Sequence, residues 1–162
     1  MTIYGFYIKV NEIKIYCESN NGPDNGNVII CLHTAGRENR QYHDMMEILQ
    51  DKYKMISFDM PAHGKSWPLP GNKVINNFVD YGKFVWEVIE ELGVKDPIVI
   101  GCSMGGNIVY HLAQEYPVKA ICSMQGADYT PTINEDILEL LNHPYVNPQH
   151  SHLEFSECLI GK

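Results

Sequence analysis

The chain of 162 residues has the length of one folded domain, and its 44% hydrophobic and 20% charged residues are typical of a globular protein. Its formal net charge of −8, with Lys and Arg scattered singly, argues against a nucleic-acid partner. No apolar stretch approaches the roughly 20 residues of a membrane span, and the N-terminus lacks the layout of a signal peptide. We therefore expect a cytoplasmic protein with no membrane partner.

The five cysteines fit that compartment, because they are odd in number and include no CxxC pair. Cys31 and Cys122 lie in apolar runs that predict buried strands, where a free thiol packs as a small hydrophobe. Cys102 is the candidate for a reactive thiol because it precedes Ser103, although reactivity requires an exposed, electropositive setting.

The first elements are predicted to be strands. Residues 5–18 alternate between apolar and polar positions, with a reversal at Asn11-Glu12, and predict an antiparallel hairpin. A turn-rich segment, 20–27, separates this hairpin from the apolar run 28–33. That run is too short for a helix and is rich in β-branched residues, which indicates a strand covered on both faces.

Helices and strands then alternate. Apolar residues over 42–49 follow the spacing of an amphipathic helix, and residues 53–60 form the next predicted strand. A loop rich in Pro and Gly follows. Apolar positions from 74 to 92 keep helical spacing up to Gly93, which is a natural stop.

The second half repeats the alternation. We predict a strand over 97–101, a helix over 104–116 and another buried strand over 118–126. Thr132 and Glu135 have the spacing of a capping box, which predicts the start of a last helix. Such alternation is typical of βαβ units, so we expect an α/β fold with a mostly parallel, doubly wound sheet and the antiparallel hairpin at its N-terminal end.

A serine lies between glycines where the strand at 97–101 gives way to a helix. Gly101-Cys102-Ser103-Met104-Gly105 matches the Gly-x-Ser-x-Gly pattern. On a tight strand-to-helix turn the glycines allow close backbone approach, and the serine Oγ projects from the carboxyl end of the strand. The Met104 N–H then becomes the natural first donor to an oxyanion. The alternative is that Ser103 serves only as a helix N-cap.

Two further segments, "LHTAGRENRQY" (32–42) and "FDMPAHGKS" (58–66), each follow a predicted strand. Together with "GCSMGG" they resemble the α/β-hydrolase family in order and spacing, from residue 5 to about residue 130. The resemblance implies that Ser103 is the nucleophile and that the backbone N–H groups of Met104 and Ala35 form the oxyanion hole. It also implies a core over 1–130 and the start of a cap region over 131–162.

The same resemblance gives expectations for the flanking loops. The family usually has His-Gly where this chain has His33-Thr34, which bears on the backbone angle of the second oxyanion donor. Asp59, Gly64 and Ser66 match a structural turn, so His63 is expected to be a loop residue and not a proton carrier.

The acid and the base of the family's triad follow the nucleophile in the chain and lie beyond the cap. This chain ends at Lys162, so we expect both to be missing and the chain to be a truncated N-terminal portion. A tail histidine as base and Asp128 as acid remain open alternatives. A metal site is weakly suggested, but it has no third ligand at proper spacing. The candidate bases in the tail are His143, His150 and His152; the suggestion of a metal site comes from His150 and His152 as two ligands, with Glu154 close to them in sequence.

The sequence therefore predicts the N-terminal portion of an esterase-type serine hydrolase, inactive or weakly active as this chain, without cofactor or metal. A completed site would act on a small-molecule substrate. One alternative is a non-catalytic binding or interaction protein of the same fold; another is an unrelated doubly wound domain that holds a small anion at "GCSMGG". The strand over 118–126 would be an unpaired edge, which predicts aggregation, a homo-oligomer or pairing with another chain.

Overall fold

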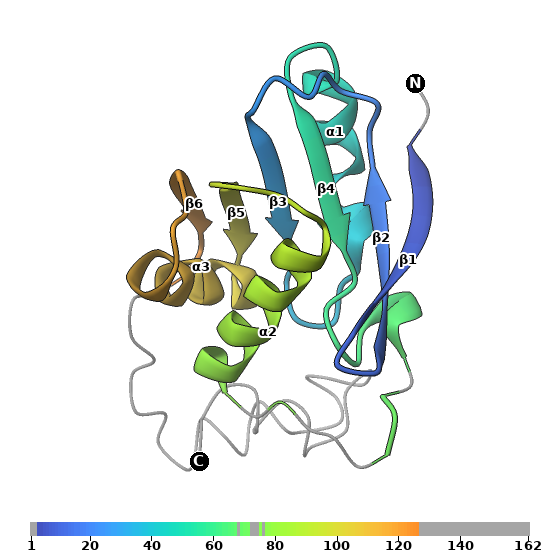
Figure 1. Cartoon of the computed structure of the whole chain (residues 1–162), viewed down its shortest axis with the longest axis vertical. Coiled ribbons are helices and arrows are strands. Elements are labelled where there is room, and N and C mark those ends of the chain that lie inside the picture. The colour runs from blue at the N-terminus through green and yellow to red at the C-terminus, as the bar shows by residue number, and fades with distance from the viewer. Residues whose placement is uncertain (1–2, 68, 72–74, 76, 127–162) are drawn as a thin grey trace.

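The computed structural model describes residues 3–67, 69–71, 75 and 77–126, and this part of the chain forms one six-stranded sheet with helices on both faces (Figure 1). The strands are β1 Tyr4–Val10, β2 Ile13–Ser19, β3 Val28–Leu32, β4 Lys54–Phe58, β5 Ile98–Cys102 and β6 Ala120–Met124.

The sheet is mixed, in the order β1-β2-β4-β3-β5-β6. β1 pairs antiparallel with β2, and β2 pairs antiparallel with β4, while β3 lies parallel between β4 and β5, and β6 is parallel to β5. The predicted hairpin is confirmed, because Asn11 and Glu12 form its two-residue turn with φ of 47° and 70°. Both residues are in the left-handed region that a two-residue hairpin with right-handed strand twist requires.

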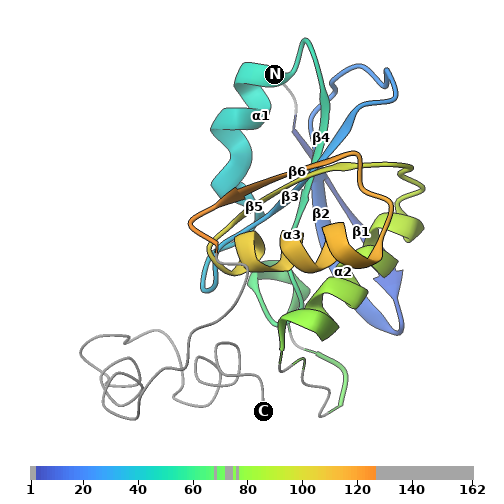
Figure 2. The same cartoon turned by 90° about the vertical axis from the view of Figure 1, so that its left-hand side faces the viewer.

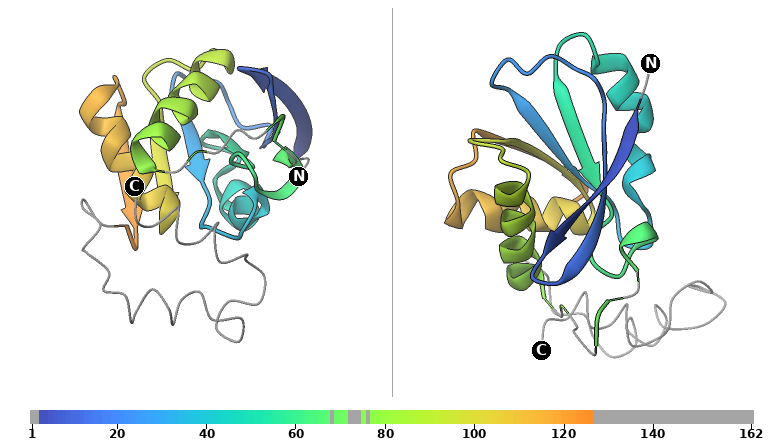
Figure 3. Two further views of the ribbon diagram at one scale, coloured as in Figure 1. Left: turned by 90° about the horizontal axis from the view of Figure 1, so that it is seen from below. Right: turned by 45° about the vertical axis from the view of Figure 1, so that its right-hand side comes forward.

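The helices lie on opposite faces of the sheet, which confirms the doubly wound α/β fold (Figures 2 and 3). α1, His43–Leu49, continues a short 3₁₀ turn, η1, Asn39–Tyr42, and covers one face. α2, Phe78–Glu91, and α3, Met104–Glu115, pack against each other on the other face. A second 3₁₀ turn, η2, spans Gly64–Ser66.

The core is split by the sheet into two layers. All five residues of β3 are buried, as expected for a central parallel strand covered on both faces. The smaller layer packs under α1 around Met46 and Met55, and the larger one packs under α2 and α3. Fully buried side chains of the larger layer include Ile15, Ile30, Leu32, Phe58, Val85, Val88, Ile108 and Leu112.

Two sequence predictions need correction. α2 begins at Phe78 and not at residue 74, because Asn77 accepts a hydrogen bond from the Asp80 N–H (2.8 Å) and caps the helix there. β6 is not a buried strand: Ala120 and Cys122 are exposed, and β6 has a neighbour on one side only within the described residues. The predicted boundary at residue 130 and the helix predicted after Thr132 lie outside the described residues.

Candidate active site

Ser103 occupies a sharp turn between β5 and α3. Its backbone angles, φ 52° and ψ −109°, lie in a region that a non-glycine residue rarely adopts. Hydrogen bonds on both sides hold this conformation: the Ser103 N–H donates to the Met124 carbonyl of β6 (2.8 Å), and the Ser103 carbonyl accepts from the Asn107 N–H (2.9 Å). The sequence prediction that residues 97–106 run from strand to helix is confirmed, and Ser103 is half-buried at the junction.

Glycines are required on both sides of this turn by close contact. A Cβ on Gly101 would lie 2.1 Å from the Gly105 carbonyl oxygen, and a Cβ on Gly105 would lie 2.2 Å from the Leu32 carbonyl oxygen. Real Cβ atoms do not approach backbone so closely, and backbone cannot move away as a flexible side chain can. The two glycines therefore let the first turn of α3 lie directly against β3 and β5.

The loop after β3 lies beside the Ser103 turn, because β3 and β5 are parallel neighbours with Leu32 paired to Gly101. The Thr34 hydroxyl donates to the Cys102 carbonyl at 3.5 Å, which is a direct link between the two loops. Thr34 also begins a turn that contains Ala35: the Arg37 N–H donates to the Thr34 carbonyl (3.0 Å), and Gly36 has a φ of 70°. A positive φ at the third position is the requirement of a type II turn, which glycine meets without strain.

His33 joins this loop to the end of β4. Its ring is fully buried, with Nδ1 donating to the Thr34 carbonyl (2.8 Å) and Nε2 accepting from the Met60 N–H (2.9 Å). Burial, together with the neighbouring His63 ring, lowers the pKa of His33 to about 3, so the imidazole stays neutral. His33 is thus a fixed structural connector and not a mobile proton carrier.

Asp59 anchors the loop after β4. The side chain is buried, and its oxygens accept the N–H groups of Asn39 (2.7 Å) and Lys65 (2.7 Å). Burial raises the pKa of this carboxyl group in spite of those two bonds. A Cβ on Gly64 would lie 2.3 Å from Asp59 Oδ2, and the Ser66 hydroxyl donates to the Asp59 carbonyl (2.7 Å). These contacts agree with the structural turn that the family resemblance implied for Asp59, Gly64 and Ser66.

Within the described residues, no side chain forms a hydrogen bond with Ser103 Oγ. The remaining histidines there contact other groups: the His43 Nε2 contacts Glu18, and His63 Nδ1 contacts the Pro61 carbonyl. His111 lies on α3, two turns along the helix from Ser103. The alternative base and acid positions in the tail lie outside the described residues, as do the possible metal ligands; they are Asp128, His143, His150, His152 and Glu154.

Cys102, the candidate reactive thiol, is half-buried, and its Sγ lies 3.8 Å from the Gln125 Oε1. In the part of the chain that the structure describes, no group of three or more His, Cys, Asp or Glu side chains is arranged to hold a metal ion. No helix in this part is long and apolar enough to cross a membrane.

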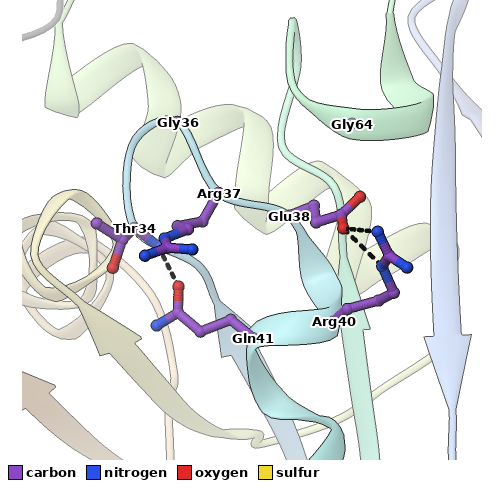
Figure 4. A pocket seen from close by; sticks show the side chains of 7 residues that line it. All are labelled: Thr34, Gly36, Arg37, Glu38, Arg40, Gln41 and Gly64. Atoms are coloured by element: carbon purple, nitrogen blue, oxygen red, sulfur yellow. Dashed lines mark hydrogen bonds and ion pairs between the residues drawn. The ribbon is translucent and has the colours of Figure 1, made fainter. Parts of the chain in front are cut away.

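A pocket of about 790 Å³ opens beside the loop after β3 (Figure 4). Its described lining comes from that loop, from η1, and from Gly64 of η2 on the opposite side. Ser103 is not among the described lining residues, and the link to it runs through Thr34, which lines the pocket and bonds to Cys102. The lining residues are Thr34, Gly36, Arg37, Glu38, Arg40, Gln41 and Gly64.

Comparison with known protein families identifies the family of this chain. The sequence model of the "alpha/beta hydrolase fold" family matches residues 27–147, which is most of the chain. The chain belongs to the α/β-hydrolase fold family. A putative hydrolase from Bacillus subtilis of known structure superimposes with a TM-score of 0.72 at 21% identity, over 90% of this chain and 52% of that one.

Curated relatives share the same region of sequence. The magnesium-chelatase 30 kDa subunit of Rhodobacter capsulatus is 30% identical over 65% of this chain and 37% of its own length. The uncharacterized hydrolase YugF of Bacillus subtilis is 28% identical over 67% of this chain and 38% of its own length. The chain thus spans less than two fifths of the length of these two curated relatives.

Three features of the site were not anticipated from the sequence. They are the link from Thr34 to Cys102, the bond from the Thr34 N–H to Gln41 Oε1 (3.1 Å), and the anchoring of Asn39 by Asp59. Thr34 and Gln41 both fall in "LHTAGRENRQY", but their pairing depends on the path of the loop, which the residue spacing alone does not reveal.

Proposed function

We propose that this chain carries the nucleophile and the oxyanion hole of an esterase-type serine hydrolase. In this proposal Ser103 Oγ attacks the carbonyl carbon of a small-molecule ester, and the N–H groups of Met104 and Ala35 bind the oxygen that becomes negative. The observation that carries the proposal is the positive φ of Ser103 at the junction of β5 and α3. A residue is held in such a conformation only when the surroundings enforce it, and this is common at catalytic positions.

Helix α3, which follows Ser103, supports the proposed oxyanion hole. Met104 is the first residue of α3, so its N–H has no partner inside the helix and points along the positive end of the helix dipole. Ala35 sits in the type II turn that the Thr34–Cys102 bond ties to the serine loop. Each N–H donor to a developing oxyanion lowers the activation free energy of acyl transfer by about 3 to 4 kcal/mol.

The rate of the reaction depends on a base that accepts the hydroxyl proton of Ser103. When the bond from Oγ to the carbonyl carbon forms, the C=O electron pair moves to the oxygen and the hydroxyl proton passes to a base; the leaving alkoxide then takes up a proton as its bond to carbon breaks. His33, His43 and His63 contact other groups, and we propose that no described residue acts as this base. We propose in addition that no tail histidine supplies the base, so the chain of 162 residues should react slowly.

The test is the rate at which a fluorophosphonate probe labels the chain with and without imidazole in the buffer. We expect slow labelling that imidazole accelerates at least tenfold, because free imidazole replaces the missing base, and we expect Ser103→Ala to abolish the accelerated labelling. Fast labelling without imidazole would show that the chain supplies its own base. No labelling at all, even with imidazole, would overturn the proposal and favour a non-catalytic binding protein of the same fold.

A further inference from the structure

The pocket beside the loop after β3 has an uneven distribution of charge. Three of its described lining side chains are charged: Arg37, Glu38 and Arg40. Glu38 and Arg40 form an ion pair with each other, and this contact raises the pKa of Arg40. Among the described residues no carboxylate forms an ion pair with Arg37, so the lining carries one guanidinium that is not neutralised within it.

Arg37 is held close to the proposed oxyanion hole. Arg37 follows Ala35 by two residues, so their Cα atoms are no more than about 7.6 Å apart. The Arg37 N–H also donates to the Thr34 carbonyl and so closes the turn that contains Ala35. Gln41 fixes the start of the loop through the Thr34 N–H, and Asp59 fixes the part after Arg37 through the Asn39 N–H. The loop that presents Arg37 is therefore anchored on both sides of it.

The two arginines of the pocket differ in direction. Figure 4 shows the Arg37 side chain on the side of Thr34 and Gln41, whereas Arg40 turns toward Glu38 on the other side. Thr34 is the lining residue whose hydroxyl bonds to the Cys102 carbonyl, next to Ser103. The chain as a whole carries a net charge of −8, so its general field repels anions. An anionic ligand would thus depend on a local cation, and Arg37 is the charged lining residue that lies outside the ion pair of Glu38 and Arg40.

We propose that Arg37 binds a carboxylate of the substrate, which makes the preferred substrate a half-ester of a short dicarboxylic acid. A guanidinium matches a carboxylate with two parallel N–H···O bonds, and such a charge-assisted contact is stronger than a neutral hydrogen bond. This inference rests on the proposed function, because it assumes that the ester carbonyl lies between Ser103 and the two N–H groups while the carboxylate lies at Arg37.

The test compares two esters of the same chain length in imidazole buffer: mono-p-nitrophenyl glutarate, which is anionic, and p-nitrophenyl valerate, which is neutral. The measured quantity is the ratio of kcat/KM for the anionic ester to that for the neutral ester. We expect Arg37→Gln to lower this ratio at least tenfold, with Arg37→Lys between Arg37→Gln and wild type. The matched control is Arg40→Gln, which removes an equal charge from the same pocket and should change the ratio less than twofold.

A binding measurement separates this inference from the proposed function. Glutarate titrated into the full chain should shift the NMR signal of the Arg37 side-chain N–H, and Arg37→Gln should weaken glutarate binding at least tenfold relative to Arg40→Gln. If glutarate binds in this way while Ser103 stays inert to fluorophosphonate, the anion site stands and the hydrolase proposal fails. If Ser103 reacts but Arg37→Gln and Arg40→Gln give the same ratio and the same glutarate affinity, the inference is wrong.

Discussion

His33 illustrates how one buried side chain supports the proposed site. The ring accepts the Met60 N–H, which would otherwise be buried without a partner, and it donates a second hydrogen bond to the Thr34 carbonyl, which also accepts the Arg37 N–H. Both bonds require the neutral ring with its proton on Nδ1, since a protonated Nε2 has no lone pair to accept with. The position of Ala35, two residues further on, thus depends on a histidine that must not be charged.

This requirement predicts how stability changes with pH. The pKa of His33 is lowered to about 3 in the folded chain, whereas an unfolded histidine titrates near pH 6.5. Between these two values the unfolded state binds more protons, so the folded state loses up to about 1.4 kcal/mol for each unit that the pH falls below 6.5. We expect urea unfolding to show this slope between pH 6 and pH 5.

The contribution of His33 is isolated by comparison with two variants. His33→Asn should be less stable than wild type at pH 7 and should have a shallower slope below pH 6.5, since the group that gains a proton on unfolding is gone. His63→Asn is the matched control, because that ring packs on His33 but is only half-buried. Equal slopes for wild type and His33→Asn would contradict this explanation.

The turn between β5 and α3 is the element that brings the proposed groups together. Its geometry depends on contacts between backbone segments: α3 approaches β3 at Gly105, and the end of β5 approaches α3 at Gly101. The strain at Ser103 is stored in the same turn and is offset by the bonds to Met124 and Asn107.

Alanine substitutions test this packing. Gly101→Ala would place a Cβ 2.1 Å from a backbone oxygen, and we expect it to lower the free energy of unfolding by at least about 3 kcal/mol. Gly82→Ala on α2 is the control, because its Cβ would meet only His111 Cβ at 3.4 Å and alanine favours helix by about 1 kcal/mol over glycine. Thermal or urea unfolding of both variants gives the comparison; equal losses would contradict the packing account.

The elements were predicted well wherever local pattern decides them. The hairpin, the central strands and the strand–serine–helix junction follow from alternation, apolar runs and the Gly-x-Ser-x-Gly spacing. The start of α2 was placed too early, because Asn77 and its bond to Asp80 outweigh the apolar spacing before it. The edge position of β6 agrees with the sequence prediction within the described residues, but its side chains were wrongly predicted to be buried, because an apolar run is the same in a covered and in an uncovered strand.

At the scale of the whole molecule, the sheet has an open edge at β6 within the described residues. Cys122 at the middle of this strand is exposed, and the strand's outer N–H and C=O groups form a template for a further strand. We therefore predict that the chain associates with itself through β6.

Sedimentation velocity over a range of protein concentrations, with reductant present, tests this prediction. The sedimentation coefficient of the wild-type chain should rise with concentration, and Cys122→Lys should suppress the rise, because a lysine at a strand edge opposes edge pairing. Ile48→Lys, at a position 78% exposed on α1, is the control for adding a charge far from this edge and should behave as wild type. A monomeric wild-type chain at all concentrations would refute the prediction.

Ser103 Oγ is the proposed nucleophile, and the most direct measurement of its role is the site of phosphonylation. After reaction with fluorophosphonate in imidazole buffer, peptide mass spectrometry should place the label on Ser103 and on no other described serine. Ser123, which lies in β6 near the same turn and donates to the Gly106 carbonyl, should stay unmodified. A label on Ser123 at a rate equal to that on Ser103 would contradict the claim that the turn makes Ser103 the nucleophile.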